Sequence, residues 1–179
     1  MQHSNLTLAQ AIREANLFER TITLPRNAYL KEAGSIDTNL YLVEAGSLRV
    51  FILDGQEQRI VRFGYENDLI VALDCLLTGA ASDFAIQAIK KTTLQVLPKH
   101  VLMQFVQADL SHLLLWSSAL EALVVQQLER EKDLLISSPS LRYQRVLKRS
   151  PQLFQQIPHK YIANYLRMTP ETLSRLKKS

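Results

Sequence analysis

The residues with the clearest chemistry lie near the end of the sequence, after residue 160. Arginine can donate two hydrogen bonds to guanine O6 and N7, and glutamate can accept one from a cytosine amine. Glu171 and Arg175 are four residues apart, so a helix would place both on one face. The alternative is an ordinary helical hairpin that closes a domain. We expect contacts to DNA from Thr169, Glu171, Thr172, Ser174, Arg175 and Lys178.

Two short helices with a tight break between them would position these side chains. The first is expected over residues 160–166, where apolar residues recur at helical spacing. Thr169 is a good N-cap for the second helix, and Pro170 suits its first position. Leu173 and Leu176 would face inward. This is the helix-turn-helix pattern, whose second helix enters the DNA major groove.

Charge is distributed unevenly along the chain. Residues 137–179 hold nine Lys and Arg and one acidic residue, a net charge of +8, whereas residues 1–136 have a net charge of −4. A basic end on an acidic body is typical of nucleic-acid binding, although a solvated basic tail gives the same count. Apolar residues at helical spacing in this segment favour a folded domain. We expect phosphate contacts from Arg142, Arg145, Lys148, Lys160 and Lys177.

Between residues 21 and 98, short alternating apolar runs are separated by Gly, Asp and Asn. The Asp54-Gly55 pair is a strong hairpin signal. Strands at this spacing predict a small all-β sandwich, barrel or roll. Helices are expected on either side of it, over residues 5–20 with Asn5 or Thr7 as the cap, and over residues 99–107.

A long helix without Gly or Pro is expected over residues 109–136. Its apolar residues cover a face too wide for one neighbour, so the surplus could pair with a second copy as in a coiled coil. A buried helix in a monomer is the alternative. The run from Ser137 to Ser140 then marks a boundary between domains 1–136 and 137–179, with Ser140 as the next cap. The dimerisation residues would be Leu113, Trp116, Leu120, Leu123, Val124 and Leu128.

The sequence also argues against several classes of protein. Its one cysteine, Cys75, rules out an intrachain disulfide and multi-cysteine zinc or iron–sulfur sites, and fits a cytoplasmic protein. We expect no signal peptide, no membrane span and no β-hairpin wing after Ser179. Neither a catalytic arrangement nor a metal-ligand spacing is present, so we expect no enzyme activity and no cofactor.

The order of elements, with an N-terminal helix, a β-roll, a long helix and a helix-turn-helix, resembles the Crp/Fnr family of bacterial transcription regulators over essentially the whole chain. The matching motifs are YLVEAGSLRVF at residues 41–51 and IANYLRMTPETLSR at residues 162–175. The second is similar to the IA-x-YLG-x-TPETLSR version found in short members. The resemblance implies an α+β fold with an antiparallel β-roll, a homodimer, and DNA and RNA polymerase as partners. It also implies that Glu171 and Arg175 read bases and that Thr172 lies near the phosphates.

Two residues depart from the family pattern. Arg167 stands where glycine is usual in the turn, and glycine reaches positive φ freely, so we expect a strained or differently shaped turn. Pro170 stands where the best-known members have a basic residue, which predicts a different operator. The first departure and the end of the sequence at Ser179 motivate an alternative, a ligand-binding or protein-interaction module with lost or non-specific DNA binding.

The resemblance raises the question of an effector, because the family's β-roll often holds a cyclic phosphate with an Arg-Ser or Arg-Thr pair. Here Ser82 and Asp83 align with that pair, and no arginine lies between Phe63 and Gln107. A buried phosphate without a guanidinium would be poorly compensated, so we expect that cAMP is not the ligand. Haem binding by His100 or His112 is not expected either.

The pocket could instead be empty, or take an unknown apolar or neutral small molecule. The residues proposed to line it are equally explained as plain core. They are Phe63, Leu69, Val71, Leu73, Ser82, Asp83, Phe84, Ile86, Trp116 and Leu120, with Leu113 beside them.

Overall fold

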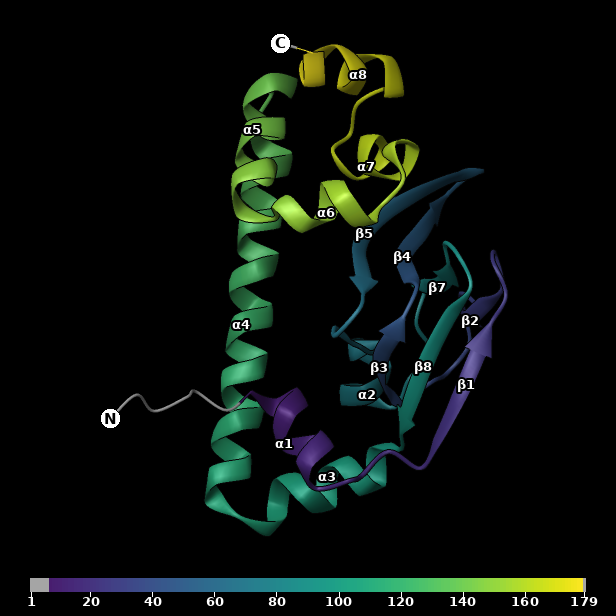
Figure 1. Ribbon diagram of the computed structural model, residues 1–179, viewed down its shortest axis with the longest axis vertical. Coiled ribbons are helices and arrows are strands. Elements are labelled where there is room, and N and C mark those ends of the chain that lie inside the picture. The colour runs from purple at the N-terminus through teal and green to yellow at the C-terminus, as the bar shows by residue number, and fades with distance from the viewer. Residues whose placement is uncertain (1–6, 179) are drawn as a thin grey trace.

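An antiparallel β-roll flanked by helices forms the body of the computed structural model, which describes residues 7–178 (Figure 1). The strands form two four-stranded sheets, in the orders β1-β8-β3-β6 and β2-β7-β4-β5. This architecture confirms the predicted α+β fold with an antiparallel β-roll. The strands are β1 (Arg20–Leu24), β2 (Tyr29–Lys31), β3 (Leu40–Ala45), β4 (Ser47–Asp54), β5 (Glu57–Tyr65), β6 (Leu69–Ile70), β7 (Ala85–Ala88) and β8 (Thr92–Leu97).

Two of the tight connections between strands of the roll contain a glycine with positive φ. Gly55 has a φ of +61° in the turn between β4 and β5, where Asp54 pairs with Glu57, so the predicted hairpin is confirmed. Gly46 has a φ of +102° between β3 and β4. A Cβ atom at Gly46 would lie 2.5 Å from the Cα of Thr92, so only glycine fits there.

The sheet that contains β7 and β4 is apolar on both faces. Ile86 of β7 packs between the two sheets, in a cluster with Leu48 and Leu94. Its neighbour Ala85 faces the other way, into a cluster that the C-terminal helices complete. Side chains alternate between faces along a strand, so a strand covered on both faces is buried throughout, as β7 is.

The helices gather at the two ends of the roll and along one side of it. Figure 1 shows α4 along the roll, with α1 and α3 at one end and α5 to α8 at the other. The helices are α1 (Leu8–Glu14), α2 (Leu73–Thr78), α3 (Lys99–Ala108), α4 (Leu110–Leu135), α5 (Pro139–Arg149), α6 (Pro151–Gln156), α7 (His159–Tyr165) and α8 (Pro170–Lys178).

The first helix and several short elements differ from the prediction. Helix α1 covers only seven residues, because Asn16 has a φ of +52° and turns the chain out of the helix. Thr7 caps it in a reciprocal capping box with Gln10, and Asn5 lies outside the described residues. The short elements β2, β6 and α2 were not predicted, since two to six residues give too little periodicity to detect. Ser138, and not Ser140, caps α5, with its hydroxyl accepting from the amide of Leu141.

Helix α4 has one side toward the roll and an exposed apolar stripe on the other. Trp116, Leu120 and Leu123 lie on the roll side and line a cavity there, and their role in dimerisation stays a prediction. They lie there because the helix turns each of them toward the same face as Ala119, which packs on α1 and α3. Leu113, Val124 and Leu128 are 47%, 60% and 51% exposed on the chain as described. Across residues 7–178, no helix is both long and apolar enough to cross a membrane.

Candidate functional site

The outer face of α8 brings together the polar residues that the sequence analysis selected. The Thr169 hydroxyl accepts from the amide of Thr172 at 3.2 Å, so the predicted N-cap is confirmed. Leu173 is fully buried and anchors the inner face of the helix. The outer residues border one shallow depression, formed by His159, Pro170, Glu171, Ser174, Arg175 and Lys178.

Glu171 is held in its charged form at the start of α8. A hydrogen bond from its own backbone amide is the main reason that its pKa lies below the ordinary value. The Thr169 hydroxyl and the charge of Arg175 lower the pKa further. A carboxylate that stays ionised can only accept hydrogen bonds, which is the role that a base amine requires of it.

The turn between α7 and α8 has the geometry of a Schellman motif. The amide of Met168 donates to the carbonyl of Ala163, and the amide of Arg167 donates to the carbonyl of Asn164, both at 3.0 Å. Arg167 occupies the left-handed position of the motif, with a φ of +54°. Arg167 therefore has the positive φ that glycine reaches freely, which fits the expected strain. The expectation of a differently shaped turn is wrong, because both hydrogen bonds of the motif are present.

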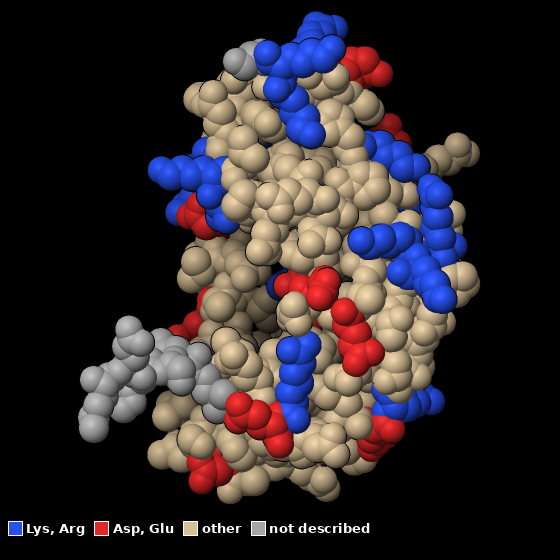
Figure 2. Space-filling view, in the orientation of Figure 1, with Lys and Arg blue, Asp and Glu red and all other residues tan. Residues whose placement is uncertain are grey.

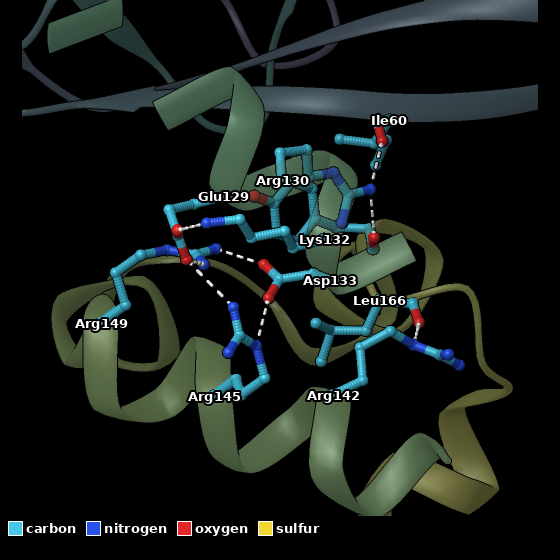
Figure 3. Close-up of polar contacts among 10 residues, drawn as sticks. Ile60, Glu129, Arg130, Lys132, Asp133, Arg142, Arg145, Arg149 and Leu166 are labelled. Carbon is cyan, nitrogen blue, oxygen red and sulfur yellow. Dashed lines mark hydrogen bonds and ion pairs between the residues drawn. The ribbon is translucent and has the colours of Figure 1, made fainter. Parts of the chain in front are cut away.

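Arg142 holds this turn from α5 and is not a surface residue. It is 6% exposed, and its Nε donates to the carbonyl of Leu166 at 2.6 Å (Figure 3). Its other nitrogens donate to the carbonyls of Ile136 and Arg167. This corrects the prediction that Arg142 contacts phosphate, because buried backbone carbonyls already take its donors.

Two more basic residues of α5 form ion pairs with acids of α4 (Figure 3). Arg145 lies 3.1 Å from the buried carboxylate of Asp133 and 3.0 Å from Glu129. Arg149 contacts the same two acids. Since its guanidinium already has two carboxylate partners, Arg145 is less suited to phosphate binding than the sequence suggested.

The predicted phosphate-binding residues that remain are exposed lysines. Lys148, Lys160 and Lys177 are all exposed, on α5, α7 and α8 respectively. Figure 2 shows basic side chains gathered at the end of the molecule that carries α8. The basic character predicted for the C-terminal segment is therefore at the surface, where Arg167 and Arg175 are exposed as well as these lysines.

A cavity of about 760 Å³ lies between the roll and α4, and part of its mouth is visible as a hollow in Figure 2. Six of the predicted pocket residues line it: Phe63, Leu69, Val71, Leu73, Trp116 and Leu120. Four others do not. Ile86 and Phe84 belong to the core between the sheets, Ser82 is buried beneath Phe84, and Asp83 is exposed.

The cavity also has a polar part that the sequence analysis missed. Arg62, Asp68 and Gln126 line it, and an Nη of Arg62 donates to the Oε1 of Gln126 at 3.2 Å. Burial lowers the pKa of Arg62 and raises the pKa of Asp68. Arg62 and Phe63 both line the cavity, although strand alternation alone would place them on opposite faces, so Arg62 could not be recognised from the sequence.

In the segment that aligns with the family's phosphate-binding pair, backbone carbonyls already accept hydrogen bonds from another residue of the chain. Lys31 is buried on β2, and its ammonium donates to the carbonyls of Ser82 and Phe84 at 3.0 and 2.8 Å. It also donates to the carbonyl of Glu32. Three carbonyls take up the ammonium donors, so Lys31 is not placed to bind a phosphate.

The β-roll matches a known protein family. Residues 21–109 match the family described as the cyclic nucleotide-binding domain. No curated protein sequence matches the chain.

Three similar solved structures cover nearly all of the chain. FixK2 from Bradyrhizobium japonicum has a TM-score of 0.73 at 17% identity, covering 89% of this chain and 82% of that one. A CooA mutant from Carboxydothermus hydrogenoformans has the same score and identity, with 98% and 84% covered. The catabolite activator protein of Thermus thermophilus has a TM-score of 0.58 at 24% identity, with 98% and 84% covered. These likenesses show a shared fold.

Proposed function

We propose that this chain, whose residues 21–109 carry the cyclic nucleotide-binding domain fold, is a sequence-specific DNA-binding transcription regulator of the Crp/Fnr type. The observation that carries the proposal is the outer face of α8. It is capped by Thr169, anchored by Leu173, and bears Glu171 and Arg175 one turn apart. Such a helix can enter the major groove and read base edges with its N-terminal half.

In a homodimer with α4 at its interface, the two copies could read one DNA site together. The exposed stripe contains Leu114, Val124 and Leu128, and an isolated chain would leave these side chains in water. Burying them against a second α4 recovers their hydrophobic stabilisation. A twofold dimer of this kind reads a near-palindrome whose half-sites lie about one helical turn of DNA apart.

Lysines around α8 would supply the contacts that do not depend on sequence. Lys148, Lys160 and Lys177 are exposed on three helices of the C-terminal unit. Each lysine that neutralises a phosphate releases counterions, so affinity should fall steeply as salt rises. These contacts position the protein, and the outer face of α8 supplies the specificity.

The cavity beside α4 is the proposed effector site. Trp116, Leu69 and Val71 give it an apolar lining, so it suits a mainly apolar molecule better than a cyclic nucleotide. The position of Lys31 supports the same conclusion, because its ammonium is already committed to carbonyls at Ser82 and Phe84. An effector other than cAMP, or none, is therefore proposed.

Selection of DNA fragments from a random pool by the purified chain tests the function. Wild type should enrich a short inverted repeat, and Arg175→Ala should not, because it removes the proposed guanine contact. Arg26→Ala is the matched control, since Arg26 is exposed in the turn between β1 and β2. Enrichment of the same repeat by Arg175→Ala would contradict the assignment of Arg175 as the base reader.

The second candidate is a ligand-binding or protein-interaction module without sequence readout. The ion pairs of Arg145 and Arg149 favour this candidate, because these two side chains are already paired with carboxylates and are less able to bind DNA phosphates. This alternative predicts that wild type, Arg175→Ala and Arg26→Ala all retain DNA equally, and only at low salt.

A further inference from the structure

Helix α7 packs on two different partners with two different faces. Ile162, Ala163 and Leu166 are buried in a cluster that contains apolar side chains of α5, α6 and α8. Tyr161 and Tyr165, four residues apart, contact the roll instead. The helix that precedes the DNA-reading helix is therefore also the helix that joins the C-terminal unit to the roll.

The central contact of this junction is made by Asn164 on the edge of a sheet. Strand β5 is the last strand of its sheet, so the backbone groups of its outer edge pair with no strand among the described residues. The Oδ1 of Asn164 accepts from the amide of Ile60 at 2.9 Å, and its Nδ2 donates to the carbonyl of Gln58 at 2.7 Å. The carboxamide thus takes the place of one peptide group of a neighbouring strand, because it carries the same donor and acceptor as a peptide group.

Two arginines surround this contact. Arg130 of α4 donates to the carbonyls of Ile60 and Tyr165, and its guanidinium lies 3.6 Å from the centre of the Tyr165 ring. Arg49 of β4 lies 4.7 Å from the centre of the Tyr161 ring. Together these contacts fix α7 in one orientation on the roll, because they combine directional hydrogen bonds with ring contacts at three separate points.

The junction also contains a buried charge that lacks a direct ion-pair partner among the described residues. Arg130 is 5% exposed and forms no ion pair within the described residues, and its Nη1 is buried without a hydrogen-bond partner. Burial lowers its pKa. A buried cation without a carboxylate is costly, so the docked arrangement depends on the hydrogen bonds that oppose this cost.

We infer that Asn164 is a positioning residue that holds the DNA-reading unit on the free edge of β5 and thereby sets the distance between the two recognition helices of a dimer. The inference rests on the proposed function. Asn164 lies on α7 and faces away from the outer face of α8, so its role is in geometry and not in base contact. If α7 leaves β5, each unit still binds a half-site, but the two units no longer match one fixed spacing.

Asn164→Asp tests the inference, because aspartate keeps the acceptor for Ile60 and faces the carbonyl of Gln58 without a donor. Asn164→Leu removes both hydrogen bonds without adding charge, and serves if the first variant does not fold. Gln155→Glu is the control, since it adds the same charge at an exposed position of α6. Each protein is titrated against the selected palindrome, a single half-site, and palindromes with one base pair added or removed at the centre.

Both Asn164 variants should bind the palindrome about tenfold more weakly, the size expected when one or two hydrogen bonds of a buried contact are lost. Half-site affinity should stay within about twofold, and discrimination between spacings should fall. Amide exchange at Ile60 should become faster in Asn164→Leu, and Gln155→Glu should behave as wild type in every measurement.

Equal losses on the half-site and the palindrome would show a general structural role and overturn the inference. An unchanged palindrome affinity in both variants would overturn it too. If wild type selects no inverted repeat at all, the proposed function fails and the inference fails with it. A wild type that selects a repeat, with the spacing preference retained in both variants, overturns the inference alone.

Discussion

The Nε of Arg142 donates to the carbonyl of Leu166 at 2.6 Å, so a residue of α5 holds the turn between α7 and α8. Further donors of the same side chain reach the carbonyls of Arg167, in that turn, and Ile136, at the end of α4. One buried guanidinium therefore ties α5 to the end of α4 and to the turn between α7 and α8.

Arg142→Ala should destabilise the protein by about 2–4 kcal/mol, because it leaves the buried carbonyl of Leu166 and two partly buried carbonyls without this donor. Urea unfolding measures this free energy directly. Lys148→Ala removes an exposed cation from the same helix and should leave stability within about 0.5 kcal/mol of wild type. Equal stabilities of the two variants would contradict the structural role of Arg142.

The left-handed position of Arg167 predicts which replacements it tolerates. A β-branched residue is strained at a φ of +54°, so Arg167→Val should lower the free energy of unfolding by about 1–2 kcal/mol. Arg167→Gly should be no less stable than Arg167→Val, since glycine adopts this region without strain. Thermal unfolding compares the two, and a more stable Val variant would contradict the conformation of the turn.

The exposed stripe of α4 predicts the residues on which assembly depends. The double variant Val124→Glu and Leu128→Glu should be monomeric, because it places like charges in the proposed seam. Sedimentation velocity measures the assembly state. Gln127→Glu adds charge at an exposed neighbouring position and should remain dimeric. A dimer that survives the double variant would place the interface elsewhere.

Trp116 is the one tryptophan of the chain and lines the cavity, so its emission reports binding there. Titration with cAMP should leave the emission unchanged, because Lys31 is committed to carbonyls at Ser82 and Phe84. A Lys31→Met variant should give the same result. A saturable change in wild type would contradict the exclusion of cAMP.

Much of the fold was predictable from local patterns in the sequence. The hairpin at Asp54-Gly55, the Thr169 cap and the long helix α4 each have a local cause, and each is present in the structure. Residues with non-local roles were assigned wrongly. Arg142 is basic and near the C-terminus, as a phosphate-binding residue would be, and only the tertiary structure shows that it is buried.

The candidate site also contains features that local sequence patterns predict and residues whose roles depend on the tertiary structure. The outer face of α8 could be predicted, because a short capped helix presents its residues by periodicity alone. The contact of Asn164 with β5 could not be predicted, because a sequence does not show which strand of a roll lies at the edge of a sheet. Arg62 was missed for a related reason, since its place in the cavity depends on where α4 lies against β5.

The decisive experiment is footprinting of the chain on the duplex that it selects. A dimeric regulator should protect two equivalent segments on one face of the DNA, with centres about one helical turn apart, or roughly 10 base pairs. Arg175→Ala should lose both segments together, because each copy in the dimer contributes the same side chain. Uniform protection along the duplex, unchanged in Arg175→Ala and abolished by salt, would contradict a dimeric, sequence-reading regulator.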